Sequence, residues 1–338
     1  MRAVFMTRKG GPKVLEVREC PDPAPGPGQV RVRVRAAGVN FADVMARLGL
    51  YSGAPQPPCI LGLEAAGVVD AVGSGVESPA VGTRVLVLSS FAAQAELLVV
   101  PARQAIPLPE GMSFEDGAAL PVNYLTAYHA LFRVGALRPG EKVLVHMAAG
   151  GVGIAALQLC RTVPGVVTFG TASAGKHEVI RAHGCDHPID YRTLDYAAEV
   201  RRLGGGGVDL VLDPLGGGDW RKGYDLLRPA GRLIAYGFAN LASGERRNLL
   251  HLARQLLSVP RFSPLRLMND NRSVAGIYLG SLWNEQEMLM AEVEALFELH
   301  RRGAIRPLVD AILPFAEAPA AHRRLQERRN VGKVLLAP

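Results

Sequence analysis

The segment VLVHMAAGGVGIAALQLC, which begins at Val143, restricts the fold of this chain more than any other. An apolar strand, a glycine-rich loop and an apolar helix follow one another in it. The loop Ala148–Gly153 has the pattern G-x-G-x-x-G, with alanine at the first glycine. The second glycine of the pattern lets a pyrophosphate approach the backbone, the third lets the helix pack closely on the strand, and the unpaired N–H groups of the helix attract an anion. The pattern predicts a dinucleotide site with contacts from Ala149, Gly150, Gly151, Val152 and Gly153.

Apolar strands alternate with helical stretches from Val143 to about residue 236. Such a series predicts a parallel, doubly wound sheet, and a glycine loop inside it is stronger evidence for nucleotide binding than the pattern alone. Residues 241–272 break this rhythm. Within the series we expect strands 143–147, 166–170, 187–189, 208–212 and 231–236 and helices near 151–161, 176–183, 194–203 and 219–227. After it we expect a strand at Ser273–Leu279, a helix at Asn284–Arg302 and a strand at Val334–Ala337.

The first third of the chain has the pattern of a β-rich domain. Gln29–Ala37 alternates valine with arginine, which indicates a strand with one buried face. The proline-rich segment 21–28 cannot lie within a sheet, because proline lacks the ladder donor. Ser113, with Asp116 three residues later, marks the start of a helix. The spacing predicts a small barrel-like β domain with strands at Arg2–Thr7, Val14–Arg18, Gln29–Ala37, Gly67–Val72 and Thr83–Leu88.

The residues after the second strand of the parallel sheet select between the two nicotinamide dinucleotides. In NAD-binding sheets this strand ends in an acidic residue that binds the ribose 2′-OH. Here the sequence is FGTASAGK, from Phe169 to Lys176, without a carboxylate. Hydroxyl groups and a lysine suit a 2′-phosphate, because they donate hydrogen bonds where an acid would repel. We therefore favour NADP(H) over NAD(H), with contacts from Thr171, Ser173, Lys176 and, after the third strand, Tyr191. The alternative is that Ser173 and Lys176 only form the cap and solvated first turn of a helix.

Composition excludes several other classes of protein. Lysine and arginine exceed aspartate and glutamate by 38 to 31, a net charge of +7, but no aromatic-interleaved basic strand or zinc finger points to nucleic acid. The four cysteines have neither CxxC nor Cys/His spacing, so we expect no disulfide framework and no zinc cluster. The sequence has no signal peptide and no apolar run long enough to cross a bilayer, so we expect a cytoplasmic protein without a transmembrane segment.

Several motifs resemble the medium-chain dehydrogenase/reductase superfamily, and in particular its zinc-free quinone oxidoreductase branch. They are GVNFAD (38–43), GLY (49–51), GLEAAGV (62–68), the loop 148–153 and NVGKVL (330–335). The resemblance is closest to vesicle amine transport protein homologues, through GVNFADVMARLGLY, VNYLTAYHALF, GTASAGKHE and HPIDYRTLDY, and covers essentially the whole chain.

The resemblance implies an α/β fold of two domains. A GroES-like catalytic domain would comprise residues 1–122 and 263–338, and a Rossmann domain would comprise residues 123–262. The resemblance also implies a homodimer. Joining two nucleotide-domain sheets near Ser273–Leu279 would bury an otherwise exposed strand edge.

The same resemblance implies that no zinc is held at the catalytic site. Asn40 stands where zinc-containing relatives have a cysteine ligand, and Leu63 stands where they have a histidine, while Glu64 remains. A carboxylate without its partners cannot hold zinc in four-coordinate geometry. We expect Glu64 to be structural and to pair with an arginine.

The resemblance further implies that Asn40, Asp43 and Tyr51 line the cleft near the nicotinamide. Tyr51 is the candidate hydrogen-bond or proton donor, because a phenol with an ordinary pKa of about 10 stays protonated at neutral pH. The alternatives are that Tyr51 only walls the pocket and that Asp43 caps a helix.

Other residues are expected near the cofactor. Thr126 and Asn330 match family positions that approach it. The loops Asp213–Gly217 and Gly237–Asn240, the second of which contains Phe238, follow strand ends where ligands bind in such sheets. We expect His146, before the phosphate loop, to be packed in the core.

Without a metal that polarises a carbonyl, the easiest reaction is hydride transfer to an activated C=C bond. We therefore predict an NADPH-dependent oxidoreductase that reduces a quinone or an α,β-unsaturated carbonyl compound. An enoyl-CoA or other enoyl thioester is an open alternative, because the arginines between 246 and 266 can contact coenzyme A phosphates or can simply be solvated. A binding role at a vesicle or lipid surface is another, suggested by the apolar–basic alternation of residues 249–268.

Overall fold

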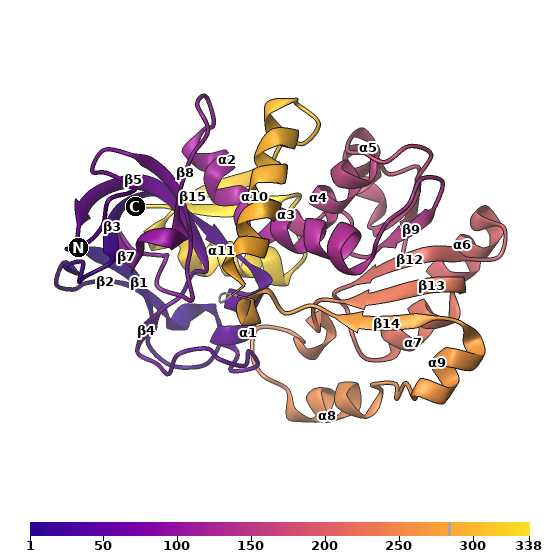
Figure 1. The fold of residues 1–338 in the computed structure, drawn as a ribbon. Helices are drawn as coiled ribbons and strands as arrows, with labels where there is room; N and C mark the ends of the chain where they lie inside the picture. Colours follow the sequence, from indigo (N-terminus) through magenta and orange to yellow (C-terminus); the bar gives the residue numbers. More distant parts are fainter. Residues whose placement is uncertain (283–284) are drawn as a thin grey trace. The chain divides into compact units, whose positions relative to one another are not determined.

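The computed structural model describes residues 1–282 and 285–338. The chain forms two compact units (Figure 1). The first unit consists of Met1–Val122, Ala242–Arg247 and Pro307–Pro338, and the second consists of Asn123–Leu241 and Asn248–Arg306.

The first unit is built on a seven-stranded sheet in the order β15-β16-β3-β5-β6-β8, in which β7 also pairs with β3. A three-stranded sheet, β2-β1-β4, accompanies it. The expected β-rich domain is confirmed, including the antiparallel pairing of the first two strands. The strands are β1 (Arg2–Met6), β2 (Leu15–Glu19), β3 (Gln29–Val39), β4 (Cys59–Ile60), β5 (Glu64–Val72), β6 (Arg84–Leu88), β7 (Leu97–Pro101), β8 (Ala105–Pro107), β15 (Val309–Pro314) and β16 (Lys333–Ala337).

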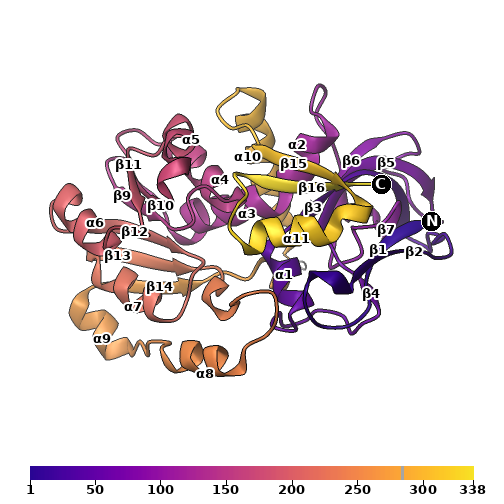
Figure 2. The same cartoon turned by 180° about the vertical axis from the view of Figure 1, so that it is seen from behind.

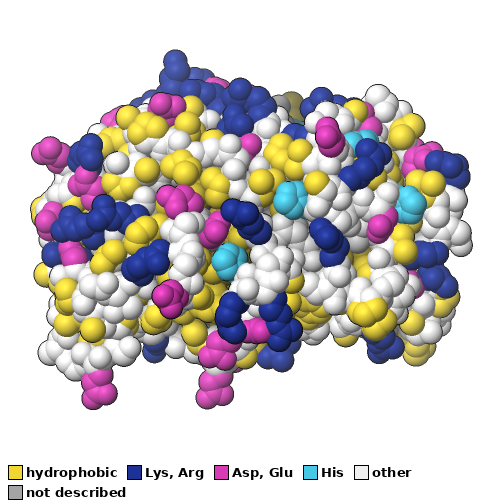
Figure 3. All heavy atoms as spheres, turned by 90° about the horizontal axis from the view of Figure 1, so that it is seen from above, with side chains coloured by type: hydrophobic (Ala, Val, Ile, Leu, Met, Phe, Trp, Pro, Cys, Tyr) yellow, Lys and Arg dark blue, Asp and Glu magenta, His cyan; other side chains and the backbone are white. Residues whose placement is uncertain are grey.

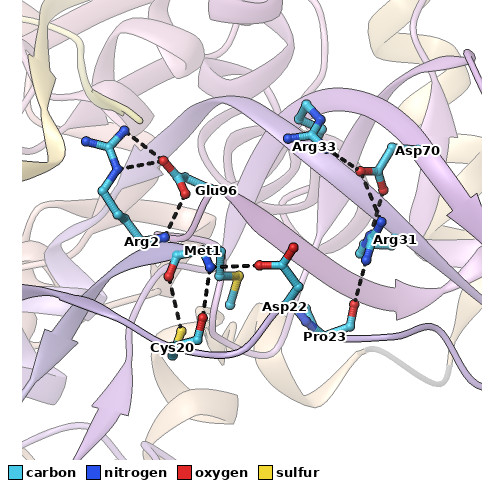
Figure 4. Close-up of polar contacts among 9 residues, drawn as sticks. All are labelled: Met1, Arg2, Cys20, Asp22, Pro23, Arg31, Arg33, Asp70 and Glu96. Atoms are coloured by element: carbon cyan, nitrogen blue, oxygen red, sulfur yellow. Dashed lines mark hydrogen bonds and ion pairs between the residues drawn. The ribbon is translucent and has the colours of Figure 1, made fainter.

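Strand β3 shows why the alternating pattern marks a half-buried strand. Val30, Val32 and Val34 are buried in the core of the first unit. Arg31 and Arg33 point to the other side, where both pair with Asp70 of β5, at 2.8 and 2.9 Å (Figure 4). The apolar row holds the strand on the core, and the arginine row keeps the opposite face polar.

The helices of the first unit pack on these sheets. Ser113 accepts a hydrogen bond from the Asp116 N–H at 3.0 Å, which confirms the expected helix start. Side chains of α1 and α11 share one apolar cluster with β1 and β16. The helices are α1 (Phe41–Arg47), α2 (Phe114–Ala119) and α11 (Ala318–Gln326), with 3₁₀ turns at Pro12–Val14, Ala102–Gln104 and Phe315–Glu317.

The second unit contains a six-stranded sheet in the order β11-β10-β9-β12-β13-β14, all parallel. The expected doubly wound α/β sheet is therefore confirmed. The strands are β9 (Lys142–Val145), β10 (Val167–Ala172), β11 (His187–Asp190), β12 (Val208–Asp213), β13 (Leu227–Ala235) and β14 (Ser273–Gly276). Strand β14 forms the edge next to β13 (Figure 2).

Helices connect the strands of the second unit. They are α3 (Pro121–Tyr128), which begins in the first unit, α4 (Gly151–Cys160), α5 (His177–Ala182), α6 (Tyr196–Gly204), α7 (Gly218–Asp225), α8 (Leu249–Leu257), α9 (Pro264–Asp270) and α10 (Gln286–Arg301), with a π-helix at His129–Val134. The strand expected at Ser273–Leu279 ends at Gly276, and a 3₁₀ turn occupies Leu279–Ser281. The expected start of α10 at Asn284 lies outside the described residues.

The compact units differ from the expected domains in one segment. Residues 263–306, which the resemblance predicts in the catalytic domain, lie in the second unit. The reason is strand pairing, because β14 extends the parallel sheet through the register Ala235↔Gly276. Helix α10 adds a buried contact within the same unit, in which Glu292 lies 2.9 Å from Nδ1 of His129.

Two basic side chains are buried between α1 and α11 in the first unit. The Arg47 guanidinium donates to the Gly10 carbonyl at 2.5 Å and to Gln326 at 2.6 Å. Neither ring nitrogen of His322 has a partner among the described residues. Burial, together with the positive charge of Arg47, lowers the pKa of His322 to about 3. His322 is therefore neutral in the folded protein wherever the fold survives.

We expect His322→Leu to make the protein more resistant to acid. Unfolded histidine takes up a proton below about pH 6.5, whereas folded His322 does not, so stability falls as the pH drops below that value. At pH 4.5 this proton uptake costs the wild type roughly 2.5 kcal/mol that the variant does not lose. Urea unfolding at pH 8 and pH 4.5 measures the difference. An equal loss of stability in both proteins between the two pH values would contradict this assignment.

Candidate functional site

The phosphate loop of the second unit is held in place by the neighbouring strand β10. The Ala148 N–H donates to the Thr171 carbonyl at 3.0 Å, and the Thr171 hydroxyl lies 3.3 Å from the Met147 nitrogen and 3.1 Å from Nδ1 of His146. Met147 adopts a left-handed backbone (φ 52°), which turns the chain out of β9 toward α4. Thr171 is itself buried. These hydrogen bonds of Thr171 support the loop, and its expected contact with the cofactor stays a prediction.

Two glycines of the loop are closely packed. A Cβ at Gly153 would lie 2.6 Å from the Cα of Ala148, so only glycine lets α4 start this close to the loop. A Cβ at Gly151 would lie 2.7 Å from the Cγ of Asn123. Asn123 of α3 therefore lies against the loop, a neighbour that the sequence pattern did not indicate.

The start of α4 fits a pyrophosphate. Its N-cap residue is Gly150, which has no side chain that could occupy the first N–H groups of the helix. Ala149 is buried, whereas Gly150, Gly151 and Val152 are partly exposed. The strand order reverses between β9 and β12, which is where ligands bind in sheets of this type.

The residues expected to bind the 2′-phosphate follow two neighbouring strands. Ala172 of β10 pairs with Asp190 of β11, so Ser173 and Tyr191 continue from the same end of the sheet. Ser173 and Lys176 are half-buried and Tyr191 is exposed. Arg192, also exposed, follows Tyr191 and is a cation that the sequence analysis did not single out. Ser173 is the N-cap of a 3₁₀ turn, as the alternative reading expected, but without a side-chain cap bond.

The loops after β12 and β13 lie side by side. The Ala239 N–H donates to the Pro214 carbonyl at 2.8 Å, and the Asn240 N–H donates to the Leu215 carbonyl at 3.0 Å. A Cβ at Gly216 would lie 2.7 Å from the Cγ atom of Phe238, so the Phe238 ring requires glycine at position 216. A Cβ at Gly237 would lie 3.0 Å from the carbonyl oxygen of Pro214. Both expected loops therefore form one surface at the carboxyl end of the sheet.

His146 is packed in the core, as the sequence analysis expected. Its ring meets that of Tyr196 edge-on, with centroids 4.7 Å apart. Burial lowers the pKa of His146, and burial raises the pKa of Asp213 on the neighbouring strand. Thr126, the other expected cofactor residue of this unit, lies on α3 and is buried.

In the first unit, Asn40, Asp43 and Glu64 form a buried polar network. Asp43 accepts hydrogen bonds from the N–H groups of Asn40 (2.7 Å) and Gly62 (3.0 Å). Burial raises the pKa of Asp43 to about 6, although these two bonds oppose the rise. The bond from the Asn40 N–H to Asp43 belongs to the capping box at the start of α1, as in the helix-cap alternative, and Asp43 is 0% exposed.

Glu64 pairs with a lysine rather than with the expected arginine. Its Oε1 atom contacts Nζ of Lys333 and accepts from Nδ2 of Asn40 at 2.9 Å, while Oε2 accepts from the Val122 N–H at 2.6 Å. A Cβ at Gly38 would lie 2.6 Å from the Cγ of Glu64, so the carboxylate also requires glycine on β3. The lysine belongs to the motif NVGKVL, but nothing in the sequence pointed from it to Glu64.

These residues do not fit a zinc ion. The ammonium of Lys333 contacts both Asn40 and Glu64, and a cation at that place repels a divalent metal. In the part of the chain that the structure describes, no three His, Cys, Asp or Glu side chains come together as metal ligands.

The two remaining candidates lie at the surface of the first unit. Tyr51 is half-buried, and its ring meets Phe91 edge-on at a centroid distance of 6.2 Å. The Asn330 side chain donates to the Gly332 carbonyl at 2.9 Å and shapes the turn before Lys333.

Known family models match most of the chain. The alcohol dehydrogenase GroES-like domain matches residues 26–110, and the zinc-binding dehydrogenase domain matches residues 183–336. Together with the β-rich unit and the parallel sheet, they define a dehydrogenase or reductase of the medium-chain class.

Sequence and structure comparisons narrow the class. The synaptic vesicle membrane protein VAT-1 homolog of Rattus norvegicus is 51% identical over 340 residues, which cover all of this chain and 84% of that protein. The crystal structure of human VAT-1 homolog-like protein has a TM-score of 0.87 at 36% identity, covering 100% of this chain and 98% of that one. Escherichia coli quinone oxidoreductase complexed with NADPH has a TM-score of 0.88 at 31% identity, with both chains fully covered. The chain belongs to the medium-chain dehydrogenase/reductase superfamily and, within it, to the VAT-1 homologues.

The name of these relatives raises the question of membrane contact. Within residues 1–282 and 285–338, no helix has the length and apolarity needed to cross a bilayer.

We expect Gly153→Ala to weaken NADPH binding by about tenfold or more, because the new methyl group meets backbone atoms that cannot move aside. Titration of NADPH fluorescence measures the affinity. Gly218→Ala is the matched control, since a Cβ there meets nothing within 4 Å. Equal affinities of the two variants would show that the loop does not bind the cofactor.

Proposed function

We propose that this protein is an NADPH-dependent oxidoreductase that reduces an activated C=C bond, in a quinone or an α,β-unsaturated carbonyl compound, without a catalytic metal. The observation that carries the proposal is that one chain contains both a phosphate loop and a first unit with a lysine at the expected zinc position. There, Asn40 and Glu64 contact the ammonium of Lys333. The NADPH complex of Escherichia coli quinone oxidoreductase supports the same chemistry.

The choice of NADPH rests on the carboxyl end of β10. Lys176 and the hydroxyl of Ser173 offer donors to a 2′-phosphate, and Tyr191 and Arg192 follow the adjacent strand. No carboxylate lies between residues 167 and 176. An acidic side chain there would repel the phosphate, so its absence favours the phosphorylated cofactor.

NADPH supplies a hydride, which is two electrons with one proton, and a proton from a side chain or water completes the reduction. Tyr51 is the proposed donor to the substrate oxygen, because a neutral phenol can donate a hydrogen bond to the growing negative charge. Asn40 is the second proposed donor. Asp43 holds the backbone that carries Asn40, through the bond from the Asn40 N–H.

The proposed reaction suits three classes of substrate: a quinone, an alkenal and an enoyl thioester. An enoyl-CoA would bring phosphates that arginines can bind, and Arg254 and Arg261 are exposed. Arg266, in contrast, pairs with Asp270 at 3.4 Å and with Asp225 at 3.6 Å, so it is less available to a ligand.

A homodimer is part of the proposal. Among the strands that the structure describes, β14 pairs only with β13. Pairing with β14 of a second copy would continue the six-stranded sheet and cover the exposed edge.

We expect the wild type to oxidise NADPH faster than NADH with at least one of 1,4-benzoquinone, trans-2-hexenal and crotonyl-CoA. Tyr51→Phe should lower kcat/KM for that substrate by about tenfold or more, because the hydroxyl donor is lost. Absorbance at 340 nm follows the reaction. Tyr278→Phe, at an exposed tyrosine of the second unit, is the control and should react like the wild type. If protein saturated with NADPH oxidises no NADPH with any of these substrates, the proposed function is contradicted.

A lipid-surface role is a second candidate, favoured by the exposed apolar side chains of α8 and α9. Leu250 and Leu257 are 85% and 87% exposed, and Leu249, Leu256, Leu265 and Met268 are exposed as well. Between residues 246 and 269 the sequence holds five arginines and no acidic residue. Apolar helix faces with arginines fit an anionic bilayer surface. Elsewhere basic and acidic side chains are interspersed, as on the face drawn in Figure 3.

For this role we expect the protein to sediment with phosphatidylcholine vesicles that contain phosphatidylserine, and to do so less with phosphatidylcholine alone. Leu250→Ser with Leu257→Ser should reduce the bound fraction severalfold, since both apolar contacts are lost. Leu194→Ser, at an exposed leucine before α6, is the matched control. Failure to bind either vesicle would remove this candidate.

A further inference from the structure

Lys333, Asn40 and Glu64 come together because three adjacent strands end at the same place. Val334 of β16 pairs with Val39 of β3, which sets Lys333 beside Asn40. Ala37 of β3 pairs with Ala65 of β5, which sets Glu64 beside Gly38. The exposed fractions of Lys333, Asn40 and Glu64 are 3%, 7% and 0%. The three polar groups therefore satisfy one another almost entirely out of water.

The chemistry of the two charged neighbours allows one orientation of the Asn40 carboxamide. An ammonium has only donors and a carboxylate has only acceptors. Nζ of Lys333 lies 2.6 Å from Oδ1 of Asn40, and Nδ2 of Asn40 lies 2.9 Å from Oε1 of Glu64. Rotating the amide by half a turn would bring its NH₂ group against the ammonium and its oxygen against the carboxylate. Both contacts would then be repulsive.

This arrangement leaves one N–H of Asn40 available. Nδ2 carries two hydrogens, and one of them goes to Glu64. For the other, no acceptor exists among the residues that the structure describes. Oδ1, in turn, is engaged by Lys333. Toward a ligand, Asn40 therefore presents a donor.

We propose that Lys333 is a positioning residue that fixes the Asn40 carboxamide with its free N–H toward the substrate, and thereby selects substrates that offer a carbonyl oxygen. The proposal rests on the proposed function, in which negative charge grows on that oxygen. Lys333 does not touch the substrate, and its charge is balanced by Glu64. Its effect reaches the reaction only through the orientation of Asn40.

The test replaces both charges, because removing Lys333 alone would leave a buried unpaired carboxylate and would destabilise the fold. The variant Glu64→Gln with Lys333→Met keeps the size of the side chains but accepts the Asn40 amide in either orientation. We expect its kcat to fall by about tenfold or more, while KM for NADPH changes less than about twofold. Lys333→Arg keeps a cationic donor and should retain most of kcat.

Asp310→Asn with Arg324→Met is the matched control. It also removes a partly buried ion pair from the first unit, joined by a 3.1 Å contact, and neither residue contacts Asn40. Its kcat should equal that of the wild type. If the double variant at Glu64 and Lys333 keeps the wild-type kcat, the proposal is overturned.

A second readout does not depend on activity. Selective ¹⁵N-asparagine labelling gives eight carboxamides, and the Asn40→Ser variant identifies that of Asn40. In the wild type we expect one of its two protons, the one bonded to Glu64, to exchange slowly with water and the other to exchange fast. Equal, fast exchange of both protons overturns the positioning role even if the double variant does not fold. If the two protons exchange at unequal rates but no substrate is turned over, the positioning of Asn40 stands and the proposed function is contradicted.

Discussion

The carboxylate of Glu64 is the group around which the first unit is organised. A buried carboxylate is stable only if charges and donors replace the lost water. Glu64 obtains them from Lys333, from the Asn40 side chain and from the Val122 N–H, that is, from β16, from the end of β3 and from the first turn of α3. Gly38 leaves the necessary space, since any side chain there would overlap with the carboxylate. One interaction thus joins segments from across the unit.

The same network makes the surroundings of Glu64 unlike a zinc site. The family model that matches residues 183–336 is described as a zinc-binding dehydrogenase. In this chain the neighbourhood of Glu64 already holds a cation, the Lys333 ammonium, which neutralises the carboxylate from within the protein. Two of the three ammonium donors go to Asn40 and Glu64 inside the network, and Lys333 is 3% exposed. In the proposed function, the donors of Asn40 and Tyr51 polarise the substrate instead.

In the second unit the corresponding constraint is the space between the phosphate loop and α4. Thr171 holds the loop from β10, Gly153 admits the helix, and Asn123 closes the loop from the side of α3. Each contact leaves the helix start clear of side chains, since Gly150 is the N-cap. The expected anion binding depends on these backbone N–H groups, so a short glycine pattern is enough to predict it.

The sequence by itself determined the order and type of most elements. The period of two in Gln29–Ala37, the βαβ alternation after Val143 and the cap at Ser113 all depend on residues close to one another in the chain, so local physics encodes them. Only the tertiary structure decided which distant residues meet. Lys333 and Asn40 are 293 positions apart and come together through the register of β16 on β3. Residues 263–306 belong to the second unit because β14 pairs with β13 at the edge of the sheet, and no local sequence pattern predicts this pairing.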